Sequence, residues 1–369
     1  MRVSAYRLAM LRVPLHEPFR TALRQVDQVE DVVLVLESSC GRLGYGSAPA
    51  TQAITGEDHD SIISSLENTL LPWAMGQEFE GLAGLRNKLA ALISDNVNAR
   101  CALEVALFDL AAQVAGEPLY AFLGGGSQHL HTGITVSVGE PLAMAEGAQR
   151  VLARGFSSLK LKVGGSVAED VARVARVAAA IGAEGKIYLD ANQAWSAQQA
   201  IEAINKMEGL GIACELVEQP VPAEDIDGLA QVRAAVNTPV MADESVFNGA
   251  DASRIIDRAA ADILNIKLVK SGGIEGALQI VDVAAKAGIN CMMGCMLESA
   301  VGVSAAAHVA AACASTITRV DLDAPMLCRE NPLVGGAEFD GPRVVLNQTP
   351  GLCSQDFRGL EYLPAGAGC

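Results

Sequence analysis

Three acidic residues stand at similar intervals along the chain, each at the end of a short apolar run. These are Asp190, Glu218 and Asp243, with spacings of 28 and 25 residues. Such spacing is typical of strands that alternate with helices, and the carboxyl ends of those strands meet at the mouth of a βα barrel. One alternative is that each acid caps the helix after its strand. Three carboxylates at one mouth would repel one another, so the pattern favours a hard divalent cation, Mg²⁺, with these acids as ligands.

Lysines flank the acids on the same set of predicted strands. Lys160 and Lys162 are two residues apart, so they share a face of one strand, while Lys267 ends another strand and Lys270 follows it. In an eight-stranded barrel these two strands lie opposite each other, which would place Lys162 and Lys267 on the two sides of a bound ligand. An isolated strand lysine usually reaches toward water instead. Beside three acids a catalytic role is favoured, because desolvation can lower a lysine pKa to about 7–8.

This combination of groups suits one chemical problem. A proton on the carbon next to a carboxylate is very weakly acidic, because its removal creates an enediolate with two negative charges. A divalent cation can stabilise that charge. If one lysine removes the proton and the opposite lysine returns one to the other face, the carbon is inverted. The sequence therefore predicts a racemase or an epimerase.

Two kinds of pattern divide the chain into an α+β unit and a barrel. Residues 1–52 are rich in β-formers, and residues 57–124 have helical spacing, with a helix predicted over 99–114, where the chain contains neither Pro nor Gly. A polar loop is expected over 19–26. From about residue 130, strands and helices alternate with a repeat of about 24 to 28 residues. The predicted strands are 132–138, 158–163, 186–191, 214–219, 239–243, 263–268, 290–295 and 317–322.

Composition limits the class of protein. The formal charge of −16 over 369 residues argues against nucleic acid or an anionic membrane as a partner. No apolar run approaches the ~20 residues that span a bilayer, and the start shows no signal-peptide pattern. The nine scattered cysteines indicate reduced packing residues of a cytoplasmic protein. Cys295, at the end of a predicted strand, is the one candidate for a thiol nucleophile.

At these residues the chain resembles the enolase superfamily, and within it the muconate-lactonising-enzyme subgroup. The resemblance implies an α/β fold, a modified TIM barrel of the (β/α)7β type over 126–324. An α+β capping domain over 1–125 is completed by a tail, 325–369, that returns to it. It also implies one Mg²⁺ per subunit, with Lys162 as a catalyst and Lys160 supporting it beside the substrate. The positions that carry the resemblance are Lys160, Lys162, Asp190, Glu218, Asp243 and Lys267.

Within the subgroup the chain looks most like the L-Ala-D/L-Glu epimerases. Asp321 and Asp323 lie on one face at the end of the last strand, which suits them to bind a substrate ammonium group, although a charged strand end near the surface is the alternative. Arg24 in the 19–26 loop is suited to pair with a glutamate side chain, and Arg20 competes for that role.

The remaining candidates surround the mouth. Ile54 and Thr55 resemble a second lid element that contacts substrate, and Leu297 and Glu298 follow the seventh strand, where they could influence side-chain specificity. Three further positions are expected to have a supporting role: Asn192, Glu244 and Lys270.

The sequence thus predicts a Mg²⁺-dependent dipeptide epimerase that exchanges the α-proton of the C-terminal residue. We expect a small-molecule dipeptide as substrate, a homo-oligomer, and a role in the turnover of cell-wall peptides. An N-acylamino-acid racemase or an o-succinylbenzoate synthase of the same subgroup is the alternative. Those substrates carry no free ammonium group, so the two predictions differ in their need for Asp321.

Overall fold

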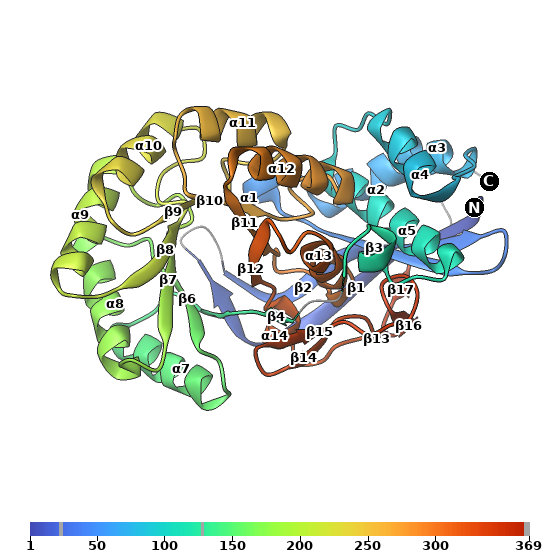
Figure 1. Cartoon of the computed structure of the whole chain (residues 1–369). Helices are drawn as coiled ribbons and strands as arrows, with labels where there is room; N and C mark the ends of the chain where they lie inside the picture. Colours follow the sequence, from blue (N-terminus) through green and yellow to red (C-terminus); the bar gives the residue numbers. More distant parts are fainter. Residues whose placement is uncertain (22–24, 127–128, 365–369) are drawn as a thin grey trace.

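The computed structural model describes residues 1–21, 25–126 and 129–364. Its first unit is an antiparallel sheet in the order β17-β1-β2-β3 (Figure 1). The strands of this sheet are β1 (Val3–Arg20), β2 (Gln25–Ser38), β3 (Leu43–Pro49) and β17 (Glu361–Tyr362).

The hairpin between β1 and β2 differs from the polar loop expected over 19–26. Phe19 pairs with Val26 and Arg20 pairs with Gln25, so both strands continue into that segment. The prediction was wrong because polar residues that alternate on an exposed hairpin satisfy their backbone by pairing, whatever their side chains. Residues 22–24, and with them Arg24, lie outside the described residues.

The predicted helix over 99–114 is α5 (Val97–Ala115). The side chain of Asn96 accepts a hydrogen bond from the backbone N–H of Ala99, and Gly116 ends the helix in the left-handed conformation. Strand β3 lies directly on α5, because a Cβ on Gly46 would come within 1.9 Å of the carbonyl oxygen of Ala102. The other helices of this part are α1 (Gln52–Thr55), α2 (His59–Ser65), η1 (Leu66–Leu70), α3 (Leu71–Met75), α4 (Gly81–Ala90) and α6 (Leu119–Phe122).

Eight parallel strands form a nearly closed barrel in the order β12 to β5, as predicted. Between β12 and β5 a bridge joins Thr132 to Val320, and the backbone N–H of Leu322 donates to Thr132 Oγ1 at 2.8 Å. The α/β modified TIM barrel is therefore confirmed. The strands are β5 (Ile134–Val136), β6 (Ser158–Lys162), β7 (Lys186–Asp190), β8 (Cys214–Glu218), β9 (Val240–Ala242), β10 (Ile263–Ile266), β11 (Asn290–Gly294) and β12 (Ile317–Asp321).

Helices cover the outside of the barrel, each after its strand (Figure 1). Several begin with a Ser or Asn side chain that accepts from a backbone N–H, as Ser166 does at α8. After β12 comes only the four-residue helix α14 (Ala324–Leu327). The long helices are α7 (Pro141–Ala153), α8 (Val167–Ile181), α9 (Ala197–Gly209), α10 (Ile226–Ala235), α11 (Gly249–Asp257), α12 (Ile274–Ala287) and α13 (Ala300–Ala312).

The tail after α14 pairs with segments from the first half of the chain. β17 pairs with β1, and β15 pairs with the short strand β4 (Leu130–His131). The division at residues 125 and 324 stays a prediction. The tail strands are β13 (Leu333–Gly335), β14 (Glu338–Asp340), β15 (Arg343–Val345), β16 (Ser354–Phe357) and β17.

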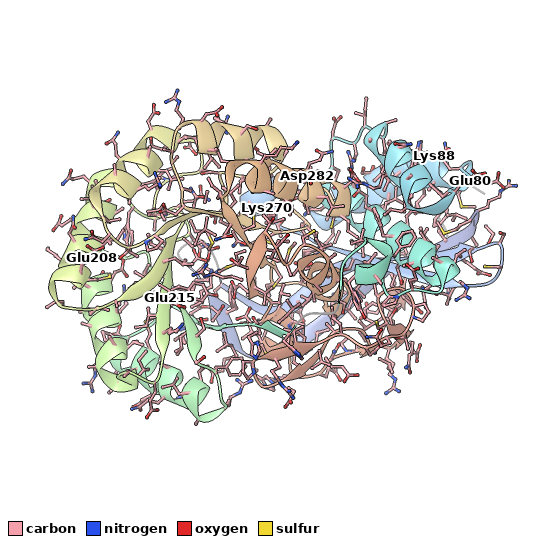
Figure 2. The ribbon with its side chains drawn as sticks, viewed as in Figure 1. Glu80, Lys88, Glu208, Glu215, Lys270 and Asp282 are labelled. Carbon is pink, nitrogen blue, oxygen red and sulfur yellow. The ribbon has the colours of Figure 1, made fainter. Side chains whose placement is uncertain are left out.

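Charged side chains separate into an outer set and a buried set. Figure 2 shows Glu80 and Lys88 around α4, at the edge of the molecule, whereas Lys270 lies inside the barrel region and is only 1% exposed. Within the described residues, no helix combines the length and apolar character needed to cross a membrane.

Candidate active site

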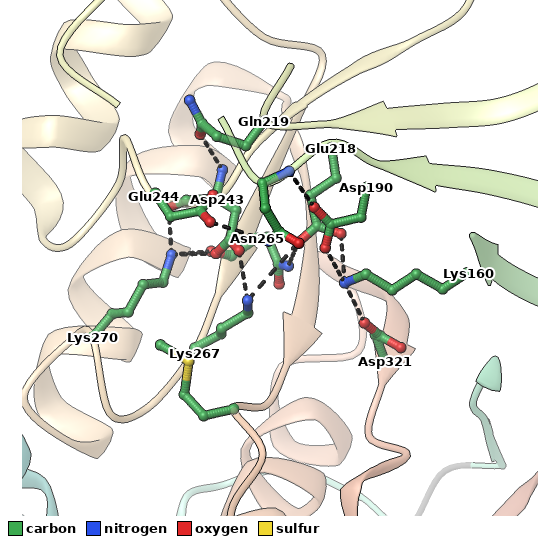
Figure 3. A network of polar contacts seen from close by, with 12 residues as sticks. Lys160, Asp190, Glu218, Gln219, Asp243, Glu244, Asn265, Lys267, Lys270 and Asp321 are labelled. Atoms are coloured by element: carbon green, nitrogen blue, oxygen red, sulfur yellow. Dashed lines mark hydrogen bonds and ion pairs between the residues drawn. The ribbon is translucent and has the colours of Figure 1, made fainter. Parts of the chain in front are cut away.

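The three predicted acids lie side by side at the barrel mouth. Asp190 ends β7 and is the register partner of Glu218 at the end of β8, while Asp243 directly follows β9. All three are fully buried. The closed parallel sheet brings them together, because the carboxyl ends of its strands converge. Figure 3 shows them in one polar network with the lysines.

The ammonium group of Lys160 lies among carboxylates from three different strands. Its Nζ is 2.7 Å from Glu218 Oε2, 3.0 Å from Asp190 Oδ2 and 2.8 Å from Asp321 Oδ2 (Figure 3). Lys160 therefore neutralises the centre of the acid row and links it to Asp321 on β12. This is consistent with the supporting role expected of it.

Lys162 and Lys267 lie at different acids of the row. Lys162 Nζ is 2.6 Å from Asp190 Oδ2 and donates to Asn192 Oδ1 at 3.1 Å. Lys267 Nζ is 2.5 Å from Asp243 Oδ2 and 3.9 Å from Glu218 Oε1. The two ammonium groups thus approach from β6 and β10, which are separated by the three acid-bearing strands. Both lysines are only about 6% exposed, so their environment is largely dry.

Lys270 holds neighbouring groups in place through its ammonium group. Its Nζ is 2.6 Å from Asp243 Oδ1 and donates to the carbonyl oxygens of Asp243, Val246 and Asn265. With four acceptors around it, this ammonium group fixes Asp243 and the end of β10. Burial is the main cause of its lowered pKa.

Two residues of the network were not predicted from the sequence. Asn265 Nδ2 donates to Glu218 Oε1 at 2.8 Å, and Gln219 Oε1 accepts from the backbone N–H of Asp243 at 2.9 Å (Figure 3). Asn265 had a usable signal, because it lies two residues before Lys267 on the same strand and so shares its face. Gln219 follows Glu218, and no pattern around it indicates its role.

Burial and mutual repulsion set the pKa values in the row. Burial and the charge of Asp190 raise the pKa of Glu218 to about 8. Burial also opposes ionisation of Asp190, but Lys160 and Lys162 outweigh it and hold the pKa of Asp190 below its usual value. For Lys267, burial lowers the pKa, whereas Asp243 and Glu218 raise it more, so the net direction is upward. The downward shift expected from desolvation alone is therefore reversed by the adjacent carboxylates.

The donor set of the row fits a divalent cation. Six buried acids of the mouth face four buried lysines, so the carboxylates exceed the ammonium groups and leave negative charge for a cation to neutralise. Among the described residues, no three His, Cys, Asp or Glu side chains form a ready metal cage, because lysine ammonium groups lie between the carboxylates. Those acids and lysines are Asp190, Glu218, Asp243, Glu244, Asp321, Asp323, Lys160, Lys162, Lys267 and Lys270.

The supporting candidates Asn192 and Glu244 connect two parts of the row. Asn192 Nδ2 donates to Glu244 Oε1 at 3.3 Å, while its backbone N–H donates to Asp190 Oδ1 at 2.9 Å. Asn192 has a positive φ of 42°, a conformation that asparagine tolerates better than most residues. Burial raises the pKa of Glu244 to about 7, with the nearby Asp243 and Asp190 adding to it.

The predicted ammonium-binding pair lies at the junction of β12 and β5. Asp321 bonds to Lys160, whereas Asp323 Oδ2 accepts from the backbone N–H of Thr135 at 2.7 Å. Both border a small cavity of about 40 Å³ that also contacts Lys162, Lys267 and the ring of Phe19. Lys162 Nζ lies 5.7 Å from the centre of that ring.

The other specificity candidates differ in their distance from this cavity. Leu297 and Cys295 line it. Glu298 is turned into the protein, where its Oε1 accepts from the backbone N–H of Met296. Burial raises the pKa of the Cys295 thiol well above its usual value, which disfavours a thiolate nucleophile.

The two predicted lid elements are residues 54–55 and the arginines of the 19–26 loop, and their links to the small cavity are less direct. Ile54 and Thr55 form the short helix α1 and are not among the described residues that line the cavity. Arg20 Nε donates to Gln25 Oε1 at 2.9 Å, and Arg24 lies outside the described residues. Which arginine meets a substrate therefore stays a prediction.

Two family models match most of the chain. Residues 5–124 match the mandelate racemase / muconate lactonizing enzyme N-terminal domain, and residues 143–355 match the enolase C-terminal domain-like family. The chain belongs to the enolase superfamily, in its muconate-lactonising-enzyme subgroup.

Relatives within this family carry closely related structures. An L-Ala-D/L-Glu epimerase from Clostridium acetobutylicum is 44% identical over 93% of this chain and 95% of its own length. A substrate-liganded complex of the L-Ala-D/L-Glu epimerase from Bacillus subtilis is 41% identical, covers 98% of this chain and 99% of its own, and superposes with a TM-score of 0.93. A dipeptide epimerase from Enterococcus faecalis in complex with Mg and L-Leu-L-Tyr is 35% identical, with coverages of 96% and 100% and a TM-score of 0.89.

Proposed function

We propose that this protein is a Mg²⁺-dependent dipeptide epimerase that acts on L-Ala-D/L-Glu. The observation that carries the proposal is the placement of Lys162 and Lys267 at opposite ends of a row of three buried acids. Its relatives with the same fold include epimerases of this specificity and an epimerase complex that contains Mg and a dipeptide.

The roles of the residues follow from their positions. Asp190, Glu218 and Asp243 would hold the Mg²⁺, which would supply positive charge beside the substrate carboxylate, where negative charge develops as the α-proton leaves. Lys162 removes the α-proton from one face, and Lys267 delivers a proton to the other. Lys160 holds Glu218, Asp190 and Asp321 in place through its three ion pairs.

Substrate orientation depends on the edge of the site. Asp321 and Asp323 would bind the free ammonium group of the dipeptide, and the alternative racemase or synthase reactions would not need them. Arg24, with Arg20 as the alternative, would pair with the glutamate side chain. The capping part, residues 1–125 with the tail 325–369, would close over the mouth of the 126–324 barrel.

The wider setting of the enzyme is also part of the proposal. We place it in the cytoplasm as a homo-oligomer, in the turnover of cell-wall peptides that contain alanine and glutamate. The described cysteines are all free, which is typical of a reducing compartment.

Isotope exchange tests the function directly. Incubation of L-Ala-L-Glu with the protein and Mg²⁺ in D₂O should replace the α-hydrogen of the glutamate residue with deuterium and produce L-Ala-D-Glu, as measured by NMR. Chelation of the metal should stop the reaction. Absence of exchange with a library of L-Ala-X dipeptides would reject the proposal.

The rival reactions are separated by one substitution. Asp321→Asn should reduce dipeptide epimerisation by about tenfold or more, because it removes a charge from the ammonium site. Turnover of an N-acylamino acid should survive the same change. Detection of N-succinylamino-acid racemisation that exceeds epimerisation in the unmodified protein would favour the rival.

A further inference from the structure

A second, larger cavity adjoins the candidate active site. It has a volume of about 520 Å³ and lies between the end of β1, β5 with the loop after it, helix α7 and helix α14. Phe19, Thr135 and Leu327 line both this cavity and the small cavity that contains Lys162 and Lys267. These three side chains are thus a shared wall, and we call the larger space the side cavity.

The side cavity has a structural origin in the barrel. Each strand from β6 to β11 is followed by a helix of nine or more residues, but β12 is followed only by the four-residue α14. The space beside β5, between α7 and α13, is therefore not filled by a long helix. The last residues of β1, on the β1–β2 hairpin, border this region through Glu17 and Phe19. These residues of β1 form one wall of the resulting cavity.

Its walls combine an apolar floor with a cationic rim. Val136, Met144 and Val151 are buried beneath it. Among the residues that the structure describes, three arginines line it against a single carboxylate, that of Glu17. The arginines are Arg20, Arg150 and Arg154.

The exposed Arg150 lies beside a gap in helix α7. A Cβ on Gly147 would lie 3.7 Å from Arg150 Nη2 and 3.7 Å from Val136 Cγ1. The guanidinium therefore lies back along the helix, over the position where Gly147 lacks a side chain, and it faces the cavity. Arg154 is engaged differently, because its guanidinium stacks 5.4 Å from the centre of the Phe156 ring.

The active-site cavity is too small to hold a dipeptide. Its volume is about 40 Å³, whereas small-molecule sites have roughly 300–1,000 Å³. A ligand with its α-carbon between Lys162 and Lys267 must extend beyond it. Asp323 stands at the shared wall, since it accepts a hydrogen bond from Thr135. A substrate amino terminus bound at Asp323 would consequently lie at the entrance of the side cavity.

We propose that the side cavity binds the side chain of the N-terminal residue of the substrate and favours long side chains that end in a carboxylate. The inference rests on the proposed dipeptide epimerase function and extends it to N-terminal residues larger than alanine. The apolar floor accommodates the methylene groups, and Arg150 pairs with the terminal carboxylate. A terminal ammonium would be repelled by the same rim.

The test compares four dipeptides that differ only in the first residue: L-Ala-L-Glu, L-Leu-L-Glu, L-Glu-L-Glu and L-Lys-L-Glu. Their kcat/KM values are measured by deuterium incorporation at the second residue. We expect the kcat/KM of L-Glu-L-Glu to exceed that of L-Lys-L-Glu by about tenfold or more, because one charge-assisted hydrogen bond contributes about this much. Equal values for these two substrates would overturn the proposed charge preference.

Two substitutions locate the effect in the side cavity. Arg150→Gln should reduce the ratio of L-Glu-L-Glu to L-Lys-L-Glu turnover by about tenfold. Gly147→Leu fills the space above Val136 and should reduce L-Leu-L-Glu relative to L-Ala-L-Glu turnover by about tenfold, since a small pocket rejects added methylenes. Arg176→Gln, at an exposed arginine of α8, is the matched control and should leave both ratios unchanged.

The outcomes separate this inference from the proposed function. If L-Ala-L-Glu is epimerised but neither ratio changes in the two variants, the side cavity is not the subsite. If no dipeptide exchanges deuterium with the unmodified protein, the epimerase function fails and the subsite falls with it. Because each variant is judged by a ratio of two substrates, a partial loss of folded protein does not affect the result.

Discussion

Fully buried carboxylates occur both at the barrel mouth and at the contact between the N-terminal part and the barrel, but their partners differ. At the contact, Glu104 on α5 accepts from the backbone N–H of Glu275 at the start of α12, at 2.9 Å, and from Arg100 Nε. Asp109, also on α5 but away from the barrel, accepts from the backbone N–H groups of Tyr45 on β3 and Leu352 in the tail. At the mouth, the principal cationic partners are lysine ammonium groups instead.

The difference separates structural acids from functional ones. A backbone N–H cannot leave its carboxylate without local unfolding, whereas an ammonium group on a flexible side chain can exchange one acceptor for another. The packing around Glu104 also fits a structural role. A Cβ on Gly273 would lie 2.5 Å from Glu104 Oε2, so the backbone at Gly273 packs closely against this carboxylate. Burial of an acid alone therefore does not indicate chemistry, but an acid held by lysines at strand ends does.

The largest expected effect comes from removing a lysine at the mouth. Lys162→Met or Lys267→Met should lower epimerisation by about 10²–10⁴-fold, the usual contribution of a general acid or base. Each variant should still exchange deuterium into one epimer only, and the two should prefer opposite epimers, since each lysine serves one face. Circular dichroism should show an intact fold. If both variants exchanged the same epimer, the two-face arrangement would be wrong.

An acid at the contact should show the opposite behaviour. Glu104→Ala leaves the N–H of Glu275 without its acceptor and removes the ion pair of Arg100, which keeps two backbone carbonyl acceptors. It should lower the free energy of unfolding by about 4 kcal/mol. Glu104→Gln keeps an acceptor and should cost less. Chemical denaturation measures both, and kcat below the unfolding transition should stay close to that of the unmodified protein. A large loss of kcat with little loss of stability would remove the distinction between the two regions.

The sequence predicted the elements well because their signals are local. The eight barrel strands were placed within about two residues, since each is a short apolar run bounded by turns. The acids and lysines at the strand ends were identified from the same repeat of about 24 to 28 residues. Their positions in space depend on closure of the barrel, which the repeat implies but does not specify residue by residue.

What the sequence could not provide are contacts between distant segments. The bond from Lys160 to Asp321 joins residues 161 positions apart and depends on how β12 meets β5. The partners of Glu104 and Asp109 include backbone N–H groups, which every residue except proline carries and which leave no mark in a sequence. The side cavity results from the absence of a long helix after β12 together with the path of the last residues of β1, which belong to the polar loop predicted over 19–26.

The smallest of these effects concerns proton binding away from the mouth. His308 on α13 accepts from the backbone N–H of Tyr120 through Nδ1, and Cys353 Sγ lies 3.7 Å from its Nε2. Burial lowers the pKa of His308 to about 4, from 6.5. Between pH 6.5 and 4, His308 is therefore protonated in the unfolded chain but not in the folded chain. Protonation of the unfolded chain lowers the free energy of unfolding as the pH drops through this range. The loss should reach about 3 kcal/mol.

The measurement is the difference in unfolding free energy between the unmodified protein and His308→Gln as a function of pH. Two buried acids of α5 titrate in the same range with the opposite sign, because burial raises the pKa of Asp109 to about 6 and that of Glu104 to about 7. Their contributions cancel in the difference, since both proteins contain them. The difference should change between pH 6.5 and 4 and be flat above pH 7, while kcat at a fixed pH stays the same. If this difference in unfolding free energy did not change with pH, His308 would bind its proton equally well in the folded and unfolded chains. Burial of this region would then not exclude a charged imidazole.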